Sequence, residues 1–193
     1  GSASFLPLAL IRERIVSSNG EVNLQDWKNP AFNEVRKPEK GLWPDWTGWD
    51  LGESGLVPQR PGGWLPMSSK PGKFELLPKA HDSKDYYLKL SGGSVFNFCG
   101  NDTDGKFKIR LNASGKGKFK LGVIEYEPIG KGGQVKFITW LKPTQEMISV
   151  DSPEWKTFES IFEKKNHKNI FAVVLAHQAG NPQIDDVYVF PVE

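Results

Sequence analysis

Apolar and polar residues alternate along much of the chain beyond residue 86. In 107–111 the apolar residues Phe107, Ile109 and Leu111 are separated by Lys108 and Arg110, and 119–123 repeats the pattern with lysines. A period of two gives a strand one apolar and one charged face, which is typical of an antiparallel sheet with one face in water. The pattern predicts strands at 86–90, 107–111, 119–123, 135–141, 170–176 and 184–192.

The segment 112–117 separates two of these strands and is rich in turn-forming residues. We therefore expect 107–111 and 119–123 to pair as a hairpin. That pairing would bring four cationic side chains together on one face of two adjacent strands: Lys108, Arg110, Lys118 and Lys120. Like charges on neighbouring strands repel unless an anionic group lies nearby, so an acidic or sulfated partner is one alternative.

The stretch 153–164 carries a different pattern. Four apolar residues recur there at the spacing of a helix, namely Trp155, Phe158, Ile161 and Phe162. Ser152-Pro153-Glu154 before them resembles a helix start. Periodicity alone therefore predicts a helix at 153–164.

The first third of the chain differs in kind. Residues 1–2 have the composition of a cloning remnant, 3–21 are predicted to be an N-terminal extension, and 22–193 are predicted to form a single domain. Residues 36–73 contain six Pro, seven Gly and four Trp, which precludes regular structure over most of that stretch. A loop of this length inside a compact domain is usually functional.

Composition narrows the class of protein further. No apolar run approaches the roughly 18 residues that a membrane-spanning helix needs, so we expect no membrane partner. A single cysteine, Cys99, excludes an internal disulfide, and the three histidines lack ligand spacing. The net charge is +2, but residues 84–142 carry ten Lys and one Arg against five acidic residues. This basic stretch lacks interleaved exposed aromatics, so we expect no nucleic-acid partner.

The most informative feature is a group of tryptophans in the Pro/Gly-rich stretch: Trp43, Trp46, Trp49 and Trp64. Loop backbone needs water for its polar groups and cannot easily bury such rings, and exposed aromatics indicate a binding surface. The face of an indole can stack on the C–H groups of a sugar ring. The alternative is that the rings fold back and cap one end of the core, for which Trp49 is best suited because it begins an apolar stretch.

We therefore expect a carbohydrate site in this loop. Trp43, Trp46 and Trp64 would be the stacking platforms, and Asp45 or Asp50 would accept hydrogen bonds from sugar hydroxyls. Trp140, on a predicted strand, is the alternative platform for a site on the face of the sheet.

Four short segments resemble the jelly-roll carbohydrate-binding modules of families such as 4, 16 and 22, which have a galactose-binding-like fold. These segments are 29–34 (Asn-Pro-Ala-Phe-Asn-Glu), 82–90, 155–162 and 183–189 (Gln-Ile-Asp-Asp-Val-Tyr-Val). The resemblance covers about residues 22–191. It implies an all-β, two-sheet antiparallel β-sandwich with a long Trp/Pro/Gly-rich loop near the N-terminal third. It also implies a strand at 153–164, and we adopt that prediction over the helix.

Those modules hold a structural calcium between an early acid and an aspartate of the last strand. The resemblance therefore implies a Ca²⁺ site formed by Glu34 and one of Asp185 and Asp186. Asn33 stands directly after Phe32, where the family has its acid, and either Asn33 or the backbone carbonyl of Asn29 is a substitute ligand. Hard oxygen ligands from two distant segments would join both ends of the domain. The alternative is an Asp pair that only terminates hydrogen bonding near a turn.

Signatures of catalysis are missing. A glycosidase needs two positioned carboxylates, and the candidate pair is Glu125 and Glu127. Alternation puts Glu125 with the core-facing residues, but the nearby Pro128 predicts a solvated strand end. The loop tryptophans and the family resemblance together predict non-catalytic binding of a polysaccharide or oligosaccharide. The resemblance further implies a secreted, periplasmic or cell-surface protein whose catalytic domain this module brings to its substrate. The alternative is a structural or interaction β-sandwich domain of a multidomain extracellular protein, without sugar affinity.

Overall fold

The computed structural model describes residues 14–16, 22–24, 31–32, 35–36, 60–61, 65–66, 73–99, 105–129 and 134–192. Within these ranges the chain forms strands and turns, with no helix. No helix of the described residues could therefore cross a membrane.

The strands fall into a short set before residue 67 and a long set after it. The short ones are β1 (Arg14–Val16), β2 (Val22–Leu24), β3 (Val35–Arg36), β4 (Arg60–Pro61) and β5 (Leu65–Pro66). The long ones are β6 (Lys73–Pro78), β7 (Tyr86–Gly92), β8 (Ser94–Cys99), β9 (Lys106–Ile129), β10 (Gln134–Trp140), β11 (Met147–Glu163), β12 (Ile170–Gly180) and β13 (Gln183–Pro191).

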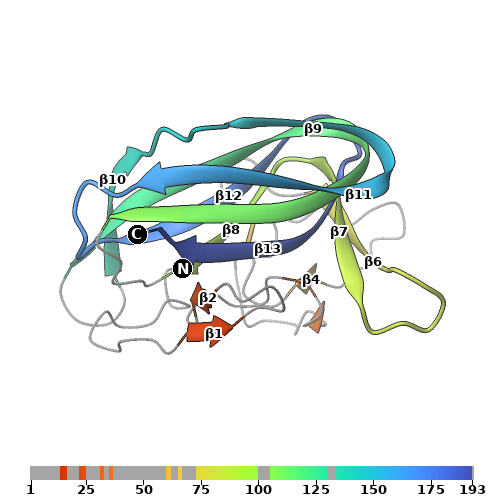
Figure 1. Cartoon of the computed structure of the whole chain (residues 1–193), viewed down its shortest axis with the longest axis horizontal. Helices are drawn as coiled ribbons and strands as arrows, with labels where there is room; N and C mark the ends of the chain where they lie inside the picture. The colour runs from red at the N-terminus through yellow and green to blue at the C-terminus, as the bar shows by residue number, and fades with distance from the viewer. Residues whose placement is uncertain are drawn as a thin grey trace.

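Strand β9 organises the whole sheet. Its first half pairs with β13 and with the second half of β11, and its second half pairs with β12, β10 and the start of β11. All of these pairings are antiparallel. The result is a nine-stranded sheet in the order β5-β8-β12-β9-β13-β7-β6, with β10 and β11 on the other edge of β9 (Figure 1).

The sheet curls so that its two halves pack face to face. The ring of Phe107, from the first half of β9, stacks on Phe171 of β12 with centroids 4.1 Å apart and on Phe162 of β11 with centroids 5.7 Å apart. Buried residues of both halves form one continuous cluster, which includes Leu88, Leu121 and Val189. The predicted all-β sandwich is thus confirmed, and its core is the alternating apolar set of the sequence.

The predicted hairpin between 107–111 and 119–123 is wrong. Both segments belong to β9, and 112–117 continues the strand instead of reversing it. The glycines of this segment serve close packing, because a Cβ on Gly117 would lie 2.5 Å from the carbonyl oxygen of Ala179. Gly115 has a φ of +81°, which glycine adopts without strain. The turn-forming residues therefore allow β9 to pass close to the β12–β13 connection.

The cationic residues of the predicted hairpin are therefore arranged differently. Lys108, Arg110, Lys118 and Lys120 lie along one strand, not on two adjacent strands. Two of them have acidic neighbours across the sheet: Lys108 Nζ is 3.7 Å from Glu159 Oε1, and Lys120 Nζ is 3.7 Å from Glu146 Oε1. Lys108 and Arg110 nevertheless stay close together, because both lie over the Phe190 ring, at 5.5 and 4.6 Å from its centroid.

The strand at 153–164 is confirmed, because residues 147–163 form the single strand β11. Its inward side chains, among them Ile148, Val150 and Phe162, are buried. The predicted strands at 86–90, 135–141, 170–176 and 184–192 correspond to β7, β10, β12 and β13. Tertiary pairing thus overrides the helical spacing of the apolar residues in this stretch.

Candidate functional site

Most of the predicted loop site lies outside the described residues. This applies to Trp43, Trp46, Trp49 and Trp64, to Asp45 and Asp50, and to the two candidate calcium ligands Asn33 and Glu34. Of the predicted site residues, the structure describes Trp140, Asp185 and Asp186. These fall into two separate places, one on β10 and one on β13.

Trp140 belongs to an aromatic patch on the outer face of the sheet. The indole is 49% exposed, and Phe137, three residues earlier on β10, is 53% exposed. In a regular strand, residues three apart point to opposite faces. Here a register shift between Phe137 and Thr139 intervenes, so that Phe137 pairs with Tyr126 and Trp140 pairs with Ile124. Because directly paired residues share a face, this bulge brings both rings to the same side.

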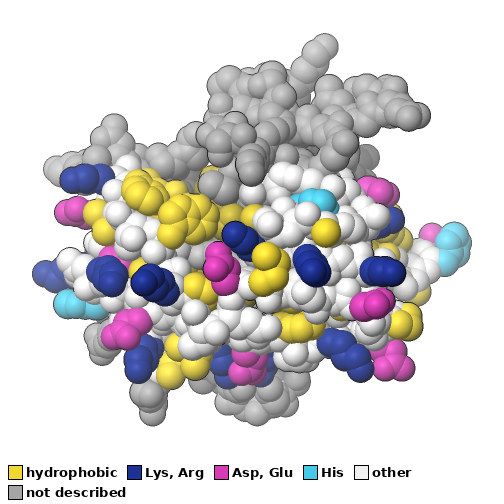
Figure 2. Space-filling model, turned by 90° about the horizontal axis from the view of Figure 1, so that it is seen from above, with side chains coloured by type: hydrophobic (Ala, Val, Ile, Leu, Met, Phe, Trp, Pro, Cys, Tyr) yellow, Lys and Arg dark blue, Asp and Glu magenta, His cyan; other side chains and the backbone are white. Residues whose placement is uncertain are grey.

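The patch extends onto β9 and β11. The Tyr126 ring packs edge-on against Phe137 at 6.3 Å, and Met147, which is 39% exposed, pairs with Lys120 on the same face. We call Tyr126, Phe137, Trp140 and Met147 the β10 patch. It holds three of the four exposed large apolar side chains of the described residues. Figure 2 shows large apolar side chains gathered at the end of the molecule where β10 lies in Figure 1.

Charged and small residues complete this surface. The exposed ion pair of Lys120 and Glu146 stands beside Met147. The Trp140 ring lies against Gly122 of β9, which has no side chain to displace it. The β10 patch thus offers rings for stacking next to an amine and a carboxylate that can bond to hydroxyl groups.

A phenol is neutral at physiological pH, and burial raises the pKa of Tyr126 further above its ordinary value of about 10. The patch therefore presents uncharged rings, which suits contact with an apolar ligand face.

Sequence reasoning found Trp140 but missed its companions. Phe137 and Trp140 are three apart and fall on one face only because of the bulge at Ile138. Tyr126 and Met147 come from other strands, and their proximity depends on pairing register. The sequence did contain one indication of the patch. Large apolar residues are unusually dense in β10, where apolar and polar residues would be expected to alternate.

The second place is the start of β13, where Asp185 is fully buried. Its Oδ2 lies 2.5 Å from Lys79 Nζ, and Oδ1 has no hydrogen-bond partner among the described residues. Burial raises the pKa of Asp185 to about 7, although Lys79 acts in the opposite direction. Burial also lowers the pKa of Lys79, but the aspartates around it outweigh burial and raise it overall.

Asp186 is held by the neighbouring strands. It has a φ of +51°, and its Oδ2 accepts a hydrogen bond from Asn112 Nδ2 at 3.0 Å. Asn112 Oδ1 in turn accepts a hydrogen bond from Thr157 Oγ1 at 2.9 Å. A chain of three side chains therefore ties β13 to β9 and β11.

Among the described residues, the arrangement around Asp185 and Asp186 does not fit a calcium site. A calcium ion takes six to eight oxygen ligands, whereas Asp185 already faces an ammonium and Asp186 an amide. No group of three or more His, Cys, Asp or Glu side chains among the described residues could hold a metal ion. Calcium binding through Asn33 or Glu34 remains a prediction, since both lie outside these residues.

Glu125 is buried, so the prediction of a solvated strand end is wrong. Its carboxylate accepts hydrogen bonds from the backbone N–H groups of Lys165 and Asn166, at 2.5 and 3.1 Å, and from Asn169 Nδ2 at 2.6 Å. Lys164 Nζ donates to the carbonyls of His167 and Asn169 in the same turn. These contacts give Glu125 a structural role: it anchors the connection between β11 and β12.

No family model matches the chain, and no curated protein matches it either. Solved structures do align with it. The xylan-binding CBM22-1 domain of Paenibacillus barcinonensis Xyn10C aligns over 68% of this chain and 86% of its own, at 10% identity and a TM-score of 0.46. A CBM4 structure aligns over 86% and 99%, at 12% identity and a TM-score of 0.46. TmCBM61 in complex with β-1,4-galactotriose aligns over 86% and 97%, at 18% identity and a TM-score of 0.41.

Proposed function

We propose that this protein binds a polysaccharide or oligosaccharide without catalysis, and that Trp140 is a stacking platform for the sugar. The observation that carries the proposal is the exposure of Trp140 and Phe137 on one face of a paired strand. Rings fixed on a strand lose little freedom when a ligand binds, which favours affinity. The loop tryptophans would add further contacts to the same ligand or a second one.

The chemistry of the β10 patch suits a sugar better than a purely apolar ligand. A sugar ring has a C–H face for stacking and hydroxyl groups along its edge. The patch supplies aromatic faces, and the Lys120–Glu146 pair beside it supplies a donor and an acceptor. This combination supports binding of a hydroxylated ring.

We extend the proposal to the role of the chain. A sugar-binding domain without catalysis is useful when it holds an attached catalytic domain near its substrate, because tethering raises effective concentration. We therefore propose that it forms part of a secreted or cell-surface protein that acts on polysaccharide. The second candidate function is docking of another protein domain. The exposed apolar area of the same patch would also suit such an interface.

Affinity electrophoresis against a panel of neutral and acidic polysaccharides tests the proposal. We expect retardation by at least one polysaccharide and at least roughly tenfold weaker binding by Trp140→Ala, because loss of a central aromatic anchor costs about 2 kcal/mol. The matched control is Ile161→Ala, which removes an exposed apolar side chain of β11 that pairs with Lys108, in the first half of β9. Binding that is equal in both variants and the wild type would exclude the β10 patch as the sugar site.

A further inference from the structure

Lys79 stands at a junction of three parts of the sheet. It follows β6 directly, and its backbone N–H donates to the carbonyl of Asp85 at 2.8 Å, which closes the β6–β7 connection. Inside this connection, the backbone N–H of Asp85 donates to Ser83 Oγ at 3.0 Å. The start of the Lys79 side chain is thus fixed by a short loop with its own hydrogen bonds.

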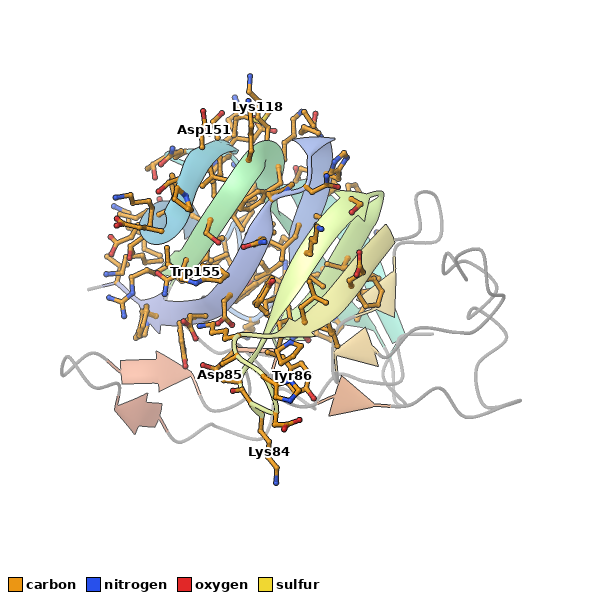
Figure 3. All side chains as sticks on the ribbon, turned by 90° about the vertical axis from the view of Figure 1, so that its right-hand side faces the viewer. Lys84, Asp85, Tyr86, Lys118, Asp151 and Trp155 are labelled. Carbon is orange, nitrogen blue, oxygen red and sulfur yellow. The ribbon has the colours of Figure 1, made fainter. Side chains whose placement is uncertain are left out.

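The ammonium group of Lys79 is surrounded by groups that attract a cation. Nζ is 2.5 Å from Asp185 Oδ2, 3.7 Å from Asp85 Oδ2 and 4.9 Å from the ring centroid of Trp155. The indole is itself held edge-on by Tyr87 at 5.5 Å. Figure 3 shows Trp155 on β11 and Asp85 on the β6–β7 connection at this junction, with Lys84 pointing away from it. Two carboxylates and an aromatic face make a cage for one positive charge.

A buried carboxylate needs such a charge. Asp185 is fully buried, and an ionised carboxylate without a partner is strongly disfavoured in a protein interior. The neighbouring Asp186 adds a second negative charge, which acts to raise the pKa of Asp185 further. Among the described residues, Lys79 thus supplies the positive charge that balances the carboxylate of Asp185.

We propose that Lys79 is a tethered counter-ion that neutralises Asp185 in place of a metal ion, so that this junction is stable without calcium. The tether matters because a side chain already in the chain needs no free ion to be captured from solution. The junction that it secures joins the β6–β7 connection to β13 and β11. The proposal stands independently of sugar binding.

Thermal unfolding of four variants tests it, each measured in EDTA and in millimolar CaCl₂. Lys79→Met keeps the length of the side chain and removes its charge, and Asp185→Asn removes the opposite charge. The double variant removes both. Lys84→Met is the matched control, since Lys84 lies on the same connection and points away from the cage.

We expect Asp185→Asn to show the same difference in Tm between EDTA and CaCl₂ as the wild type, because Asp185 faces Lys79 and not a calcium ion. Lys79→Met should lower the Tm by about 6 °C or more, as expected when one partner of a buried pair is removed. The double variant should melt above Lys79→Met, because it no longer buries an unpaired charge, and Lys84→Met should melt like the wild type.

A calcium-dependent rise in the wild-type Tm that is lost in Asp185→Asn would overturn the proposal, as would a Lys79→Met variant that melts like the wild type. If Lys79→Met does not fold at all, the double variant determines whether the loss is due to an unpaired charge. A folded double variant supports the charge pairing, and a double variant that also fails to fold contradicts it.

Discussion

The indole of Trp140 rests directly on the backbone of Gly122: a methyl group on the Gly122 Cα would stand only 2.7 Å from Cζ3 of the ring. The two residues are on different strands, β10 and β9, and the glycine leaves the space that the ring occupies. The position of the proposed sugar platform therefore depends on a residue that makes no side-chain contact of its own.

Gly122→Ala should displace the Trp140 ring and weaken sugar binding several-fold. Because the ring is half exposed, it can move outward, so the stability should change by no more than about 1 kcal/mol. Fluorescence titration with a bound polysaccharide measures the affinity. The double variant Gly122→Ala/Trp140→Ala should bind no worse than Trp140→Ala alone, because both changes act on the same contact; additive losses would show that Gly122 acts elsewhere.

Trp46→Ala tests the predicted loop site against the β10 patch. If the loop platforms carry the sugar, this variant should bind at least roughly tenfold more weakly and melt near the wild-type temperature. Comparison with Trp140→Ala in the same assay separates the two places. A Trp46→Ala protein that melts early and binds normally would show that this ring is part of the core.

Glu125→Ala should destabilise the fold by about 3 kcal/mol or more, since it leaves three donors of the 165–169 turn without their acceptor. For a chain of this size that corresponds to a decrease in Tm of roughly 6 °C or more. Glu127→Ala is the control, because Glu127 is exposed on the same strand. Equal melting of the two variants would refute the anchoring role of Glu125.

Tyr126 should make the protein more sensitive to alkali. Its pKa is raised in the folded state, so the unfolded chain ionises first as the pH rises through about 10. The folded state then loses stability with further increase in pH. Tyr126→Phe should reduce the fall in Tm between pH 9 and 11, and an unchanged slope would mean that this phenol is not the responsible group.

Much of the sheet could be predicted because burial on one face imposes a period of two. The alternation at Phe107, Ile109 and Leu111 and the apolar run in β12 follow directly from this. The continuation of the strand through 112–117 could not be predicted, because glycine serves both chain reversal and close packing. Which of the two roles applies depends on the residues that pack against Gly117, and those residues lie some sixty positions further along the chain.

The candidate site was less accessible to sequence reasoning. Trp140 was predicted because a large aromatic ring on a strand can form part of a binding site. Phe137 lies on the same face as Trp140 only because of a bulge. The partnership of Lys79 and Asp185 spans more than a hundred residues and leaves no local pattern. Such contacts depend on register and loop geometry, which composition and spacing do not encode.

The position of β9 also constrains how the protein reaches its folded state. Its partners β10, β11, β12 and β13 all follow it in the chain, and β13 ends at Pro191. While the polypeptide is being synthesised, the first half of β9 has no neighbour until most of the chain has left the ribosome. Pairing over such long sequence separations is slow to form and leaves strand edges open in the meantime. We therefore expect this sheet to assemble in a late cooperative step, after β13 has emerged, and the growing chain to depend on protection from aggregation until β13 docks.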